Sequence, residues 1–196
     1  MPATKSLPKP ERVKSFIEQR QRDHGRPIVV GVSGFAGSGK STLARSLSNA
    51  ESSFVRLRGD DFLDPALSHR RSSDWAGVDR RRLVDDVLLP FREGRQGTFR
   101  RYDWELRALG SPEPVPTGRV LLVDLIGLFH PEALPALDLT IWIDVPLETA
   151  SQRGMRRDEA LGRDHSRLWR EVWIPNEIDF DRNFSPRHNA EVLYSA

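Results

Sequence analysis

The chain has no cysteine among its 196 residues, which excludes disulfides and thiolate metal sites. It also lacks a run of 18 apolar residues, and its first ten residues (MPATKSLPKP) are polar and rich in proline. These absences argue against a membrane span and a secretory signal. We therefore expect a cytoplasmic protein without a membrane partner, and the length suits one domain with a sizeable core.

An excess of charge of one sign is missing as well. The 30 basic residues face 28 acidic ones, which leaves a net charge of +2. The basic runs at residues 79–82 and 99–101 are short, and runs of that length are typical of solvated faces. The composition therefore argues against a nucleic-acid partner.

The most informative stretch is residues 31–44, which read GVSGFAGSGKSTLA. A β-branched run at 27–33 predicts a buried strand before it, and residues 41–50 predict a helix after it. The segment between fits G-x-x-x-x-G-K-[ST], in which glycines let backbone N–H groups curl around phosphates, and the helix N-terminus adds its dipole. The sequence therefore predicts a site for a nucleoside triphosphate with Mg²⁺. The predicted site residues are Gly34, Phe35, Ala36, Gly37, Ser38, Gly39, Lys40, Ser41 and Thr42, with Lys40 on the β- and γ-phosphates and Ser41 on Mg²⁺.

Apolar runs and helical patterns alternate along the rest of the chain. Residues 1–10 read as a flexible tail, and residues 11–196 as a single domain that begins with a helix. The pattern predicts an α/β fold with a five-stranded parallel sheet and helices on both faces. The predicted strands lie at residues 27–33, 53–57, 118–129, 137–146 and 190–196, and the proline-rich stretch 111–118 reads as a surface loop.

Acidic side chains follow two of these strands. Asp60 and Asp61 come directly after the second strand, and Asp124 lies near the end of the third. An acid at this edge of the sheet is placed to accept the proton of an attacking hydroxyl, and a second acid is placed near the metal. Arg153 and Arg157 lie in a helix–turn of about 150–165, which reads as a lid that neutralises charge on the phosphoryl group.

Taken together, the motifs GVSGFAGSGKST, GDDF, RRYDW, VDLIGLF, RRDEALGRD and IPNEIDF resemble the uridine kinase and phosphoribulokinase group of P-loop kinases. The resemblance covers residues 28–195 and is strongest to the uridine kinase-like branch, to which the nicotinamide riboside kinases are related. It implies that Asp60 is the general base, that Lys40, Arg153 and Arg157 assist transfer, and that ATP and Mg²⁺ are the cofactors. The implied metal ligands are Ser41, Asp60 and Asp124, and the implied acceptor-binding residues are Asp60, Phe62, Asp74, Tyr102, Asp103 and Arg107, several of them on a hairpin at about 95–110.

Two positions depart from the pattern of the group. Asp124 stands where uridine kinases have a glutamate, and the shorter side chain favours a contact with Mg²⁺ through water. Arg107 stands where they have a histidine, and an arginine favours an acceptor that carries more oxygens or a negative charge. We therefore expect a kinase for a nucleoside or nucleoside-like hydroxyl. The alternatives are a kinase for a sugar, vitamin precursor or antibiotic, a nucleotide-binding regulator, and a nucleic-acid-linked ATPase; the sequence fits a monomer or a homo-oligomer.

Overall fold

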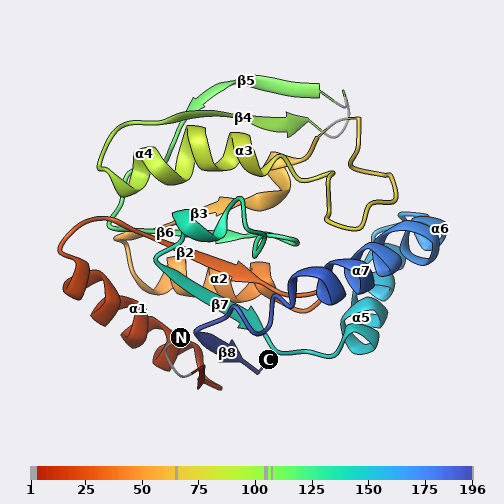
Figure 1. Ribbon diagram of the computed structural model, residues 1–196, viewed down its shortest axis with the longest axis horizontal. Helices are drawn as coiled ribbons and strands as arrows, with labels where there is room; N and C mark the ends of the chain where they lie inside the picture. The colour runs from red at the N-terminus through yellow and green to blue at the C-terminus, as the bar shows by residue number, and fades with distance from the viewer. Residues whose placement is uncertain (1–3, 65, 104–105, 107, 196) are drawn as a thin grey trace.

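Six parallel strands form the central sheet of the computed structural model, which describes residues 4–64, 66–103, 106 and 108–195 (Figure 1). Their order across the sheet is β1-β8-β7-β2-β6-β3. The α/β fold and the parallel sheet are thus confirmed, and all five predicted strands are present. Their bounds are β1 Lys5–Ser6, β2 Ile28–Ser33, β3 Phe54–Arg58, β6 Val120–Asp124, β7 Leu139–Ile143 and β8 Val192–Tyr194.

The sixth strand comes from the segment that reads as a tail. Lys5 and Ser6 pair in parallel with Val192 and Leu193, so β1 extends the sheet beyond β8. The predicted count of five strands is therefore corrected to six. Backbone hydrogen bonds make this strand rather than apolar side chains, since both of its residues are exposed.

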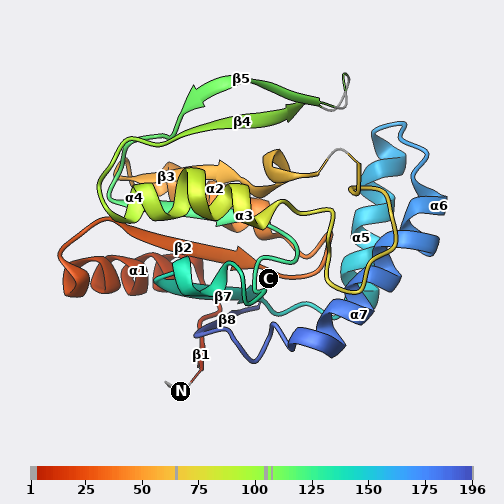
Figure 2. The same ribbon diagram turned by 45° about the horizontal axis from the view of Figure 1, so that its top comes forward.

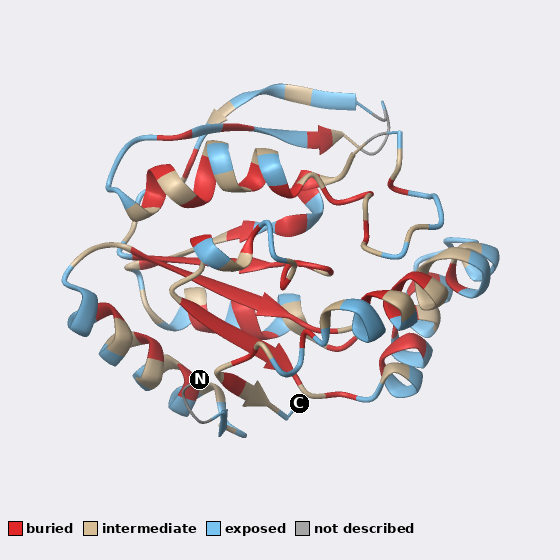
Figure 3. Cartoon of the chain, viewed as in Figure 1, coloured by how far each residue is buried: buried red, intermediate tan, exposed pale blue. Residues whose placement is uncertain are grey.

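Helices cover both faces of the sheet, as predicted, and each face has its own core (Figures 1 and 3). Helices α1 (Pro10–His24) and α2 (Lys40–Ala50) pack on one face with Ile17 and Leu47. On the other face, α3 (Arg80–Leu83), a π-helical turn (Val84–Leu88) and α4 (Leu89–Arg92) contribute Leu83 and Phe91. The three central strands are fully buried, which explains their nearly continuous apolar sequences.

The remaining helices follow β7 in the sequence. They are α5 (Leu147–Ala160), α6 (Ser166–Leu168), a π-helical turn (Trp169–Trp173) and α7 (Ile174–Phe184). Figure 2 shows α5, α6 and α7 grouped at one end of the molecule, beside the carboxyl ends of the sheet strands. Among the described residues, no helix combines the length and the apolar character that crossing a membrane requires.

A separate antiparallel hairpin consists of β4 (Thr98–Asp103) and β5 (Ala108–Pro114). It overlaps residues 95–110, where the sequence predicts a hairpin for the substrate, and extends beyond them to Pro114. The proline-rich stretch was expected to be a loop, but its first four residues belong to β5. Prolines 112 and 114 are tolerated there because β5 has one neighbour only, so its outer edge needs no ladder hydrogen bonds.

Candidate active site

The predicted phosphate loop joins the end of β2 to the start of α2. Gly34, Gly37 and Gly39 all have positive φ angles, of 150°, 83° and 110°. A side chain at Gly37 would also collide with α5, because its Cβ would lie 2.1 Å from the carbonyl oxygen of Ala150. The glycines therefore let the loop adopt an anion-binding curl and lie directly against the predicted lid helix.

Lys40 lies at the first turn of α2 and folds back over the loop. Its Nζ donates hydrogen bonds to the carbonyl oxygens of Gly34 (2.9 Å) and Phe35 (2.8 Å). Burial lowers the pKa of this ammonium, while the nearby carboxylates of Glu177, Asp60 and Asp124 favour its charged form. Among the described residues its hydrogen bonds go to carbonyl oxygens, so the ammonium has no carboxylate bonded to it and is available to the phosphates of a bound nucleotide.

Ser41 and Asp124 meet as the resemblance implies. The Ser41 hydroxyl donates to Asp124 Oδ2 at 2.5 Å, which leaves the lone pairs of the hydroxyl free for a metal. These oxygen donors fit Mg²⁺, which in kinases needs few protein ligands beside the phosphates. Asp124 itself is occupied, because Arg56 binds both of its oxygens at 2.7 and 2.8 Å. The arrangement suits an Asp124 that orients Ser41 and reaches Mg²⁺ through water.

Asp60 and Asp61 occupy a 3₁₀ turn (Gly59–Phe62) after β3 and face different surroundings. The Asp60 side chain is 56% exposed, and its nearest ion pair is Arg58 at 4.0 Å. Desolvation by the surrounding protein raises the pKa of Asp60, while the charges of Lys40 and Arg58 oppose this rise. Asp61 is buried and bonded to Arg101 of the hairpin at 2.9 Å. Asp60 is thus open for chemistry, whereas Asp61 fastens β4 to the site.

The predicted lid arginines both lie exposed on α5. Arg157 binds its neighbour Asp158 through Nε and Nη2, and its charge contributes to the electrostatics of both Lys40 and Asp60. Burial alone would raise the pKa of Asp158, but hydrogen bonds from Trp169, Arg157 and His165 lower it overall. The structure therefore brings Arg157 near the phosphate loop and places Arg153 one turn earlier on the same helix.

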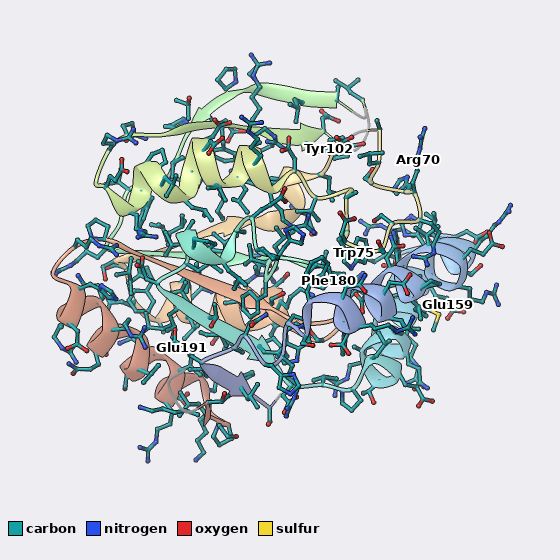
Figure 4. All side chains as sticks on the ribbon, viewed as in Figure 1. Arg70, Trp75, Tyr102, Glu159, Phe180 and Glu191 are labelled. Carbon is teal, nitrogen blue, oxygen red and sulfur yellow. The ribbon has the colours of Figure 1, made fainter. Side chains whose placement is uncertain are left out.

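The predicted acceptor-binding residues lie in several settings. Phe62 is fully buried and stacks on Phe99 with ring centroids 5.7 Å apart, so its side chain belongs to the core. Tyr102 is buried on β4, where Figure 4 shows it at the end of the hairpin.

The polar acceptor-binding residues are more accessible. Asp103 accepts a hydrogen bond from the backbone N–H of Leu106. Asp74 is half-buried, near Arg80 and His130. Arg107 lies outside the described residues.

A carboxylate that sequence reasoning missed also borders the phosphate loop. Glu177 on α7 is 2% exposed, and its Oε1 accepts a hydrogen bond of 2.6 Å from the backbone N–H of Ala36. Its Oε2 has no hydrogen-bond partner among the described residues. Burial raises the pKa of Glu177 to about 7, although Lys40 and the Ala36 amide favour ionisation. The sequence signals are the polar pair Asn176–Glu177 within an amphipathic helix and its place in the motif IPNEIDF, to which the resemblance assigns no role.

Glu177→Gln is expected to stabilise the fold at pH 8 much more than at pH 5. The folded-state pKa of about 7 lies above the ordinary value of 4.5, so the stability linked to this proton is complete below 4.5 and is lost as pH rises through 7. The shift corresponds to about 3 kcal/mol by pH 8, and glutamine keeps an acceptor for the Ala36 N–H. Urea unfolding of the unaltered and the Glu177→Gln protein at pH 5 and at pH 8 measures this difference in the free energy of unfolding. Exposed Glu171 gives the control, Glu171→Gln, and an equal effect of Glu177→Gln at both pH values would contradict the expectation.

Comparisons with known proteins agree with this geometry. No protein-family model matches the chain. It is 28% identical to a uridine kinase of Borrelia duttonii over 144 residues, which are 66% of either chain, and 39% identical to an uncharacterized kinase of Schizosaccharomyces pombe over 103 residues. The latter match covers 43% of this chain and 36% of the yeast protein. The chain therefore spans from about a third to just under two thirds of the length of these curated relatives.

Solved structures share the fold over nearly the whole chain. A possible uridine kinase from Bacillus stearothermophilus superposes with a TM-score of 0.68 at 17% identity, covering 93% of this chain and 99% of that one. A structure described provisionally as a fructose transport system kinase from Silicibacter gives 0.76 at 19% identity, covering 94% and 98%. The chain has the fold of the P-loop kinases, and its resemblance to the uridine kinase-like branch is confirmed.

Proposed function

We propose that the protein is a small-molecule kinase that transfers the γ-phosphoryl group of ATP to a hydroxyl of a nucleoside or a nucleoside-like compound. The observation that carries this proposal is the open carboxylate of Asp60 beside Lys40 of the phosphate loop. A regulator that only binds nucleotide has no need of such a base. The kinase names of the sequence relatives support the same activity.

The residues divide the work of transfer in the following way. Asp60 accepts the proton of the acceptor hydroxyl as its oxygen bonds to the γ-phosphorus and the bond from phosphorus to the ADP oxygen breaks. Lys40 and Arg157 stabilise the charge on the phosphoryl oxygens. Ser41, oriented by Asp124, is the residue that would hold Mg²⁺. When bound, this ion would neutralise part of the negative charge on the phosphates.

The acceptor lies, in this proposal, between the Asp60 turn and the hairpin. Arg101 fixes the hairpin to Asp61, and Arg82 donates to the carbonyl oxygen of Arg100 at 2.8 Å, so β4 keeps one position relative to Asp60. Tyr102 and Asp103 at the end of β4, together with Asp74, are the proposed acceptor contacts. Arg107 follows them in the sequence and favours an acceptor rich in oxygens or negatively charged.

The proposal is tested by incubating the protein with Mg²⁺, ATP and a panel of nucleosides, sugars, vitamin precursors and antibiotics, followed by mass spectrometry. The expected result is an acceptor that gains one phosphate, with no product from the Lys40→Met variant. ATP binding without a product from any acceptor would favour a regulator instead. ATP hydrolysis stimulated by DNA or RNA would favour a nucleic-acid-linked ATPase.

Within the panel, plain uridine is expected to be a poor acceptor compared with anionic or oxygen-rich alcohols. A guanidinium left unpaired against a neutral uracil edge costs on the order of 1–3 kcal/mol. Arg107→His introduces the residue of the uridine kinases. It is expected to reduce the difference in kcat/KM between uridine and the anionic or oxygen-rich alcohols. Steady-state kinetics of both proteins measure the ratio of kcat/KM values. A kcat/KM for uridine of about 10⁴ M⁻¹s⁻¹ or more in the unaltered protein would contradict the expectation.

A further inference from the structure

Two consecutive side chains of α7, Asn176 and Glu177, are 1% and 2% exposed and bind two different segments. Glu177 binds the phosphate loop through the Ala36 amide. Buried polar side chains are costly unless their hydrogen bonds are made, and Glu177 leaves one oxygen without a partner among the described residues. A buried carboxylate that costs stability next to Lys40 is a candidate for a functional role.

Asn176 binds the chain between the Asp60 turn and α3, here called the acceptor-side segment (residues 66–76). Its Oδ1 accepts from the backbone N–H of Ser72 at 3.0 Å and from Arg71 Nη1, and its Nδ2 donates to the carbonyl oxygen of Arg70 at 3.1 Å. Arg71 also pairs with Asp179 one turn further along α7. Figure 4 shows Arg70 and Trp75, both from this segment, on the side of the molecule where α7 lies.

The two segments also line one small cavity together with Glu177. A cavity of about 10 Å³ is lined by Gly34 and Phe35 of the phosphate loop, by Trp75 of the acceptor-side segment, and by Glu177 and Phe180 of α7. Its volume is close to that of a single water. The phosphate loop and the acceptor-side segment therefore border the same small space beside Glu177.

We propose that Asn176 and Glu177 are positioning residues on α7. They hold the phosphate loop (the nucleotide half of the site) in a fixed position relative to residues 66–76 (the acceptor half). Glu177 fixes the phosphate loop, and Asn176 fixes the segment that carries Asp74. This inference rests on the proposed function, because it assigns the segment 66–76 to the acceptor. Phosphoryl transfer depends on alignment of the two substrates, so a shared anchor for both halves acts on the rate as well as on binding.

The nucleotide half is tested by calorimetry of MgATP binding without any acceptor. Glu177→Leu removes the hydrogen-bond acceptor of the Ala36 N–H and is expected to weaken MgATP binding by about tenfold or more. Glu177→Gln keeps the acceptor for this N–H and is expected to stay within about threefold of the unaltered protein. This rescue by the conservative variant separates loop positioning from a requirement for charge. Loss of binding in the glutamine variant, or full binding in the leucine variant, would overturn this half.

The acceptor half is tested with Asn176→Ala. The acceptor KM is expected to rise about tenfold, with kcat reduced, while the Kd of MgATP stays within about twofold. Asn49→Ala, an exposed asparagine on α2, is the matched control. If Asn176→Ala does not fold, Arg71→Met removes one partner of Asn176 from an exposed position. It is expected to raise the acceptor KM in the same way and to leave the Kd of MgATP unchanged. Equal losses for both substrates would show a merely structural role and overturn the inference.

Hydrogen exchange separates failure of this inference from failure of the proposed function. In Asn176→Ala, residues 66–76 are expected to exchange faster while the phosphate loop is unchanged, and this readout needs no acceptor. If no compound is ever phosphorylated, the proposed function fails, and calorimetry and exchange still decide the inference. Unchanged exchange in residues 66–76 would show that Asn176 does not hold the segment.

Discussion

Lys40→Met is expected to reduce turnover by about 10²–10³-fold or more and to weaken ATP binding. Methionine keeps an unbranched side chain of similar reach, so the substitution removes the charge with little loss of packing. Among the described residues, the hydrogen bonds of this ammonium go to the carbonyl oxygens of Gly34 and Phe35. It is therefore available to the β- and γ-phosphates, and nothing else in the described part of the loop supplies a cation there.

Turnover with the best acceptor of the panel and calorimetry of MgATP binding measure this effect. Lys14→Met is the matched control, since Lys14 of α1 pairs with Glu18 and Glu51, neither of which belongs to the candidate site. Circular dichroism of both variants reports whether the fold is kept. A Lys40→Met protein that is folded and fully active would show that residues 34–42 do not form a phosphate site.

The fold around the phosphate loop could be predicted because its local and long-range preferences agree. The β-branched run of β2, the glycines with positive φ and the helix that starts at Lys40 all point to one structure. Strand β1 could not be predicted, because Lys5 and Ser6 have no apolar pattern and pair with a strand more than 180 residues away. Edge pairing of this kind depends on a neighbour that has already folded.

The candidate site could be predicted only where a residue follows directly from its own strand or loop. Asp124 ends β6 and Lys40 starts α2, so their places are fixed by adjacent sequence. The pair between Arg56 and Asp124 depends on the parallel register of β3 with β6, which the sequence does not reveal. Glu177 reads as an ordinary acid of a surface helix, and only the packing of α7 against the loop buries it.

Asp60→Asn is expected to lower the transfer rate by about 10²–10⁴-fold, the usual range for a general acid–base group, with ATP binding nearly intact. The amide keeps the size of the side chain but accepts no proton from the hydroxyl. Desolvation raises the pKa of Asp60, which makes the carboxylate a stronger base. We therefore expect the rate of the unaltered protein to fall at acid pH, where Asp60 is protonated, and this dependence to disappear in the variant.

Asp61→Asn is the matched comparison, because it changes the neighbouring carboxylate of the same turn. Asp61 binds Arg101 instead of facing solvent, so its loss loosens the hairpin and is expected to raise the acceptor KM more than it lowers kcat. Single-turnover transfer rates, acceptor KM values and the pH dependence of kcat, measured for both variants, separate the base from the anchor. An Asp61→Asn protein with the larger loss of kcat would show that the base is Asp61 and that the alignment with the uridine kinases is shifted by one residue.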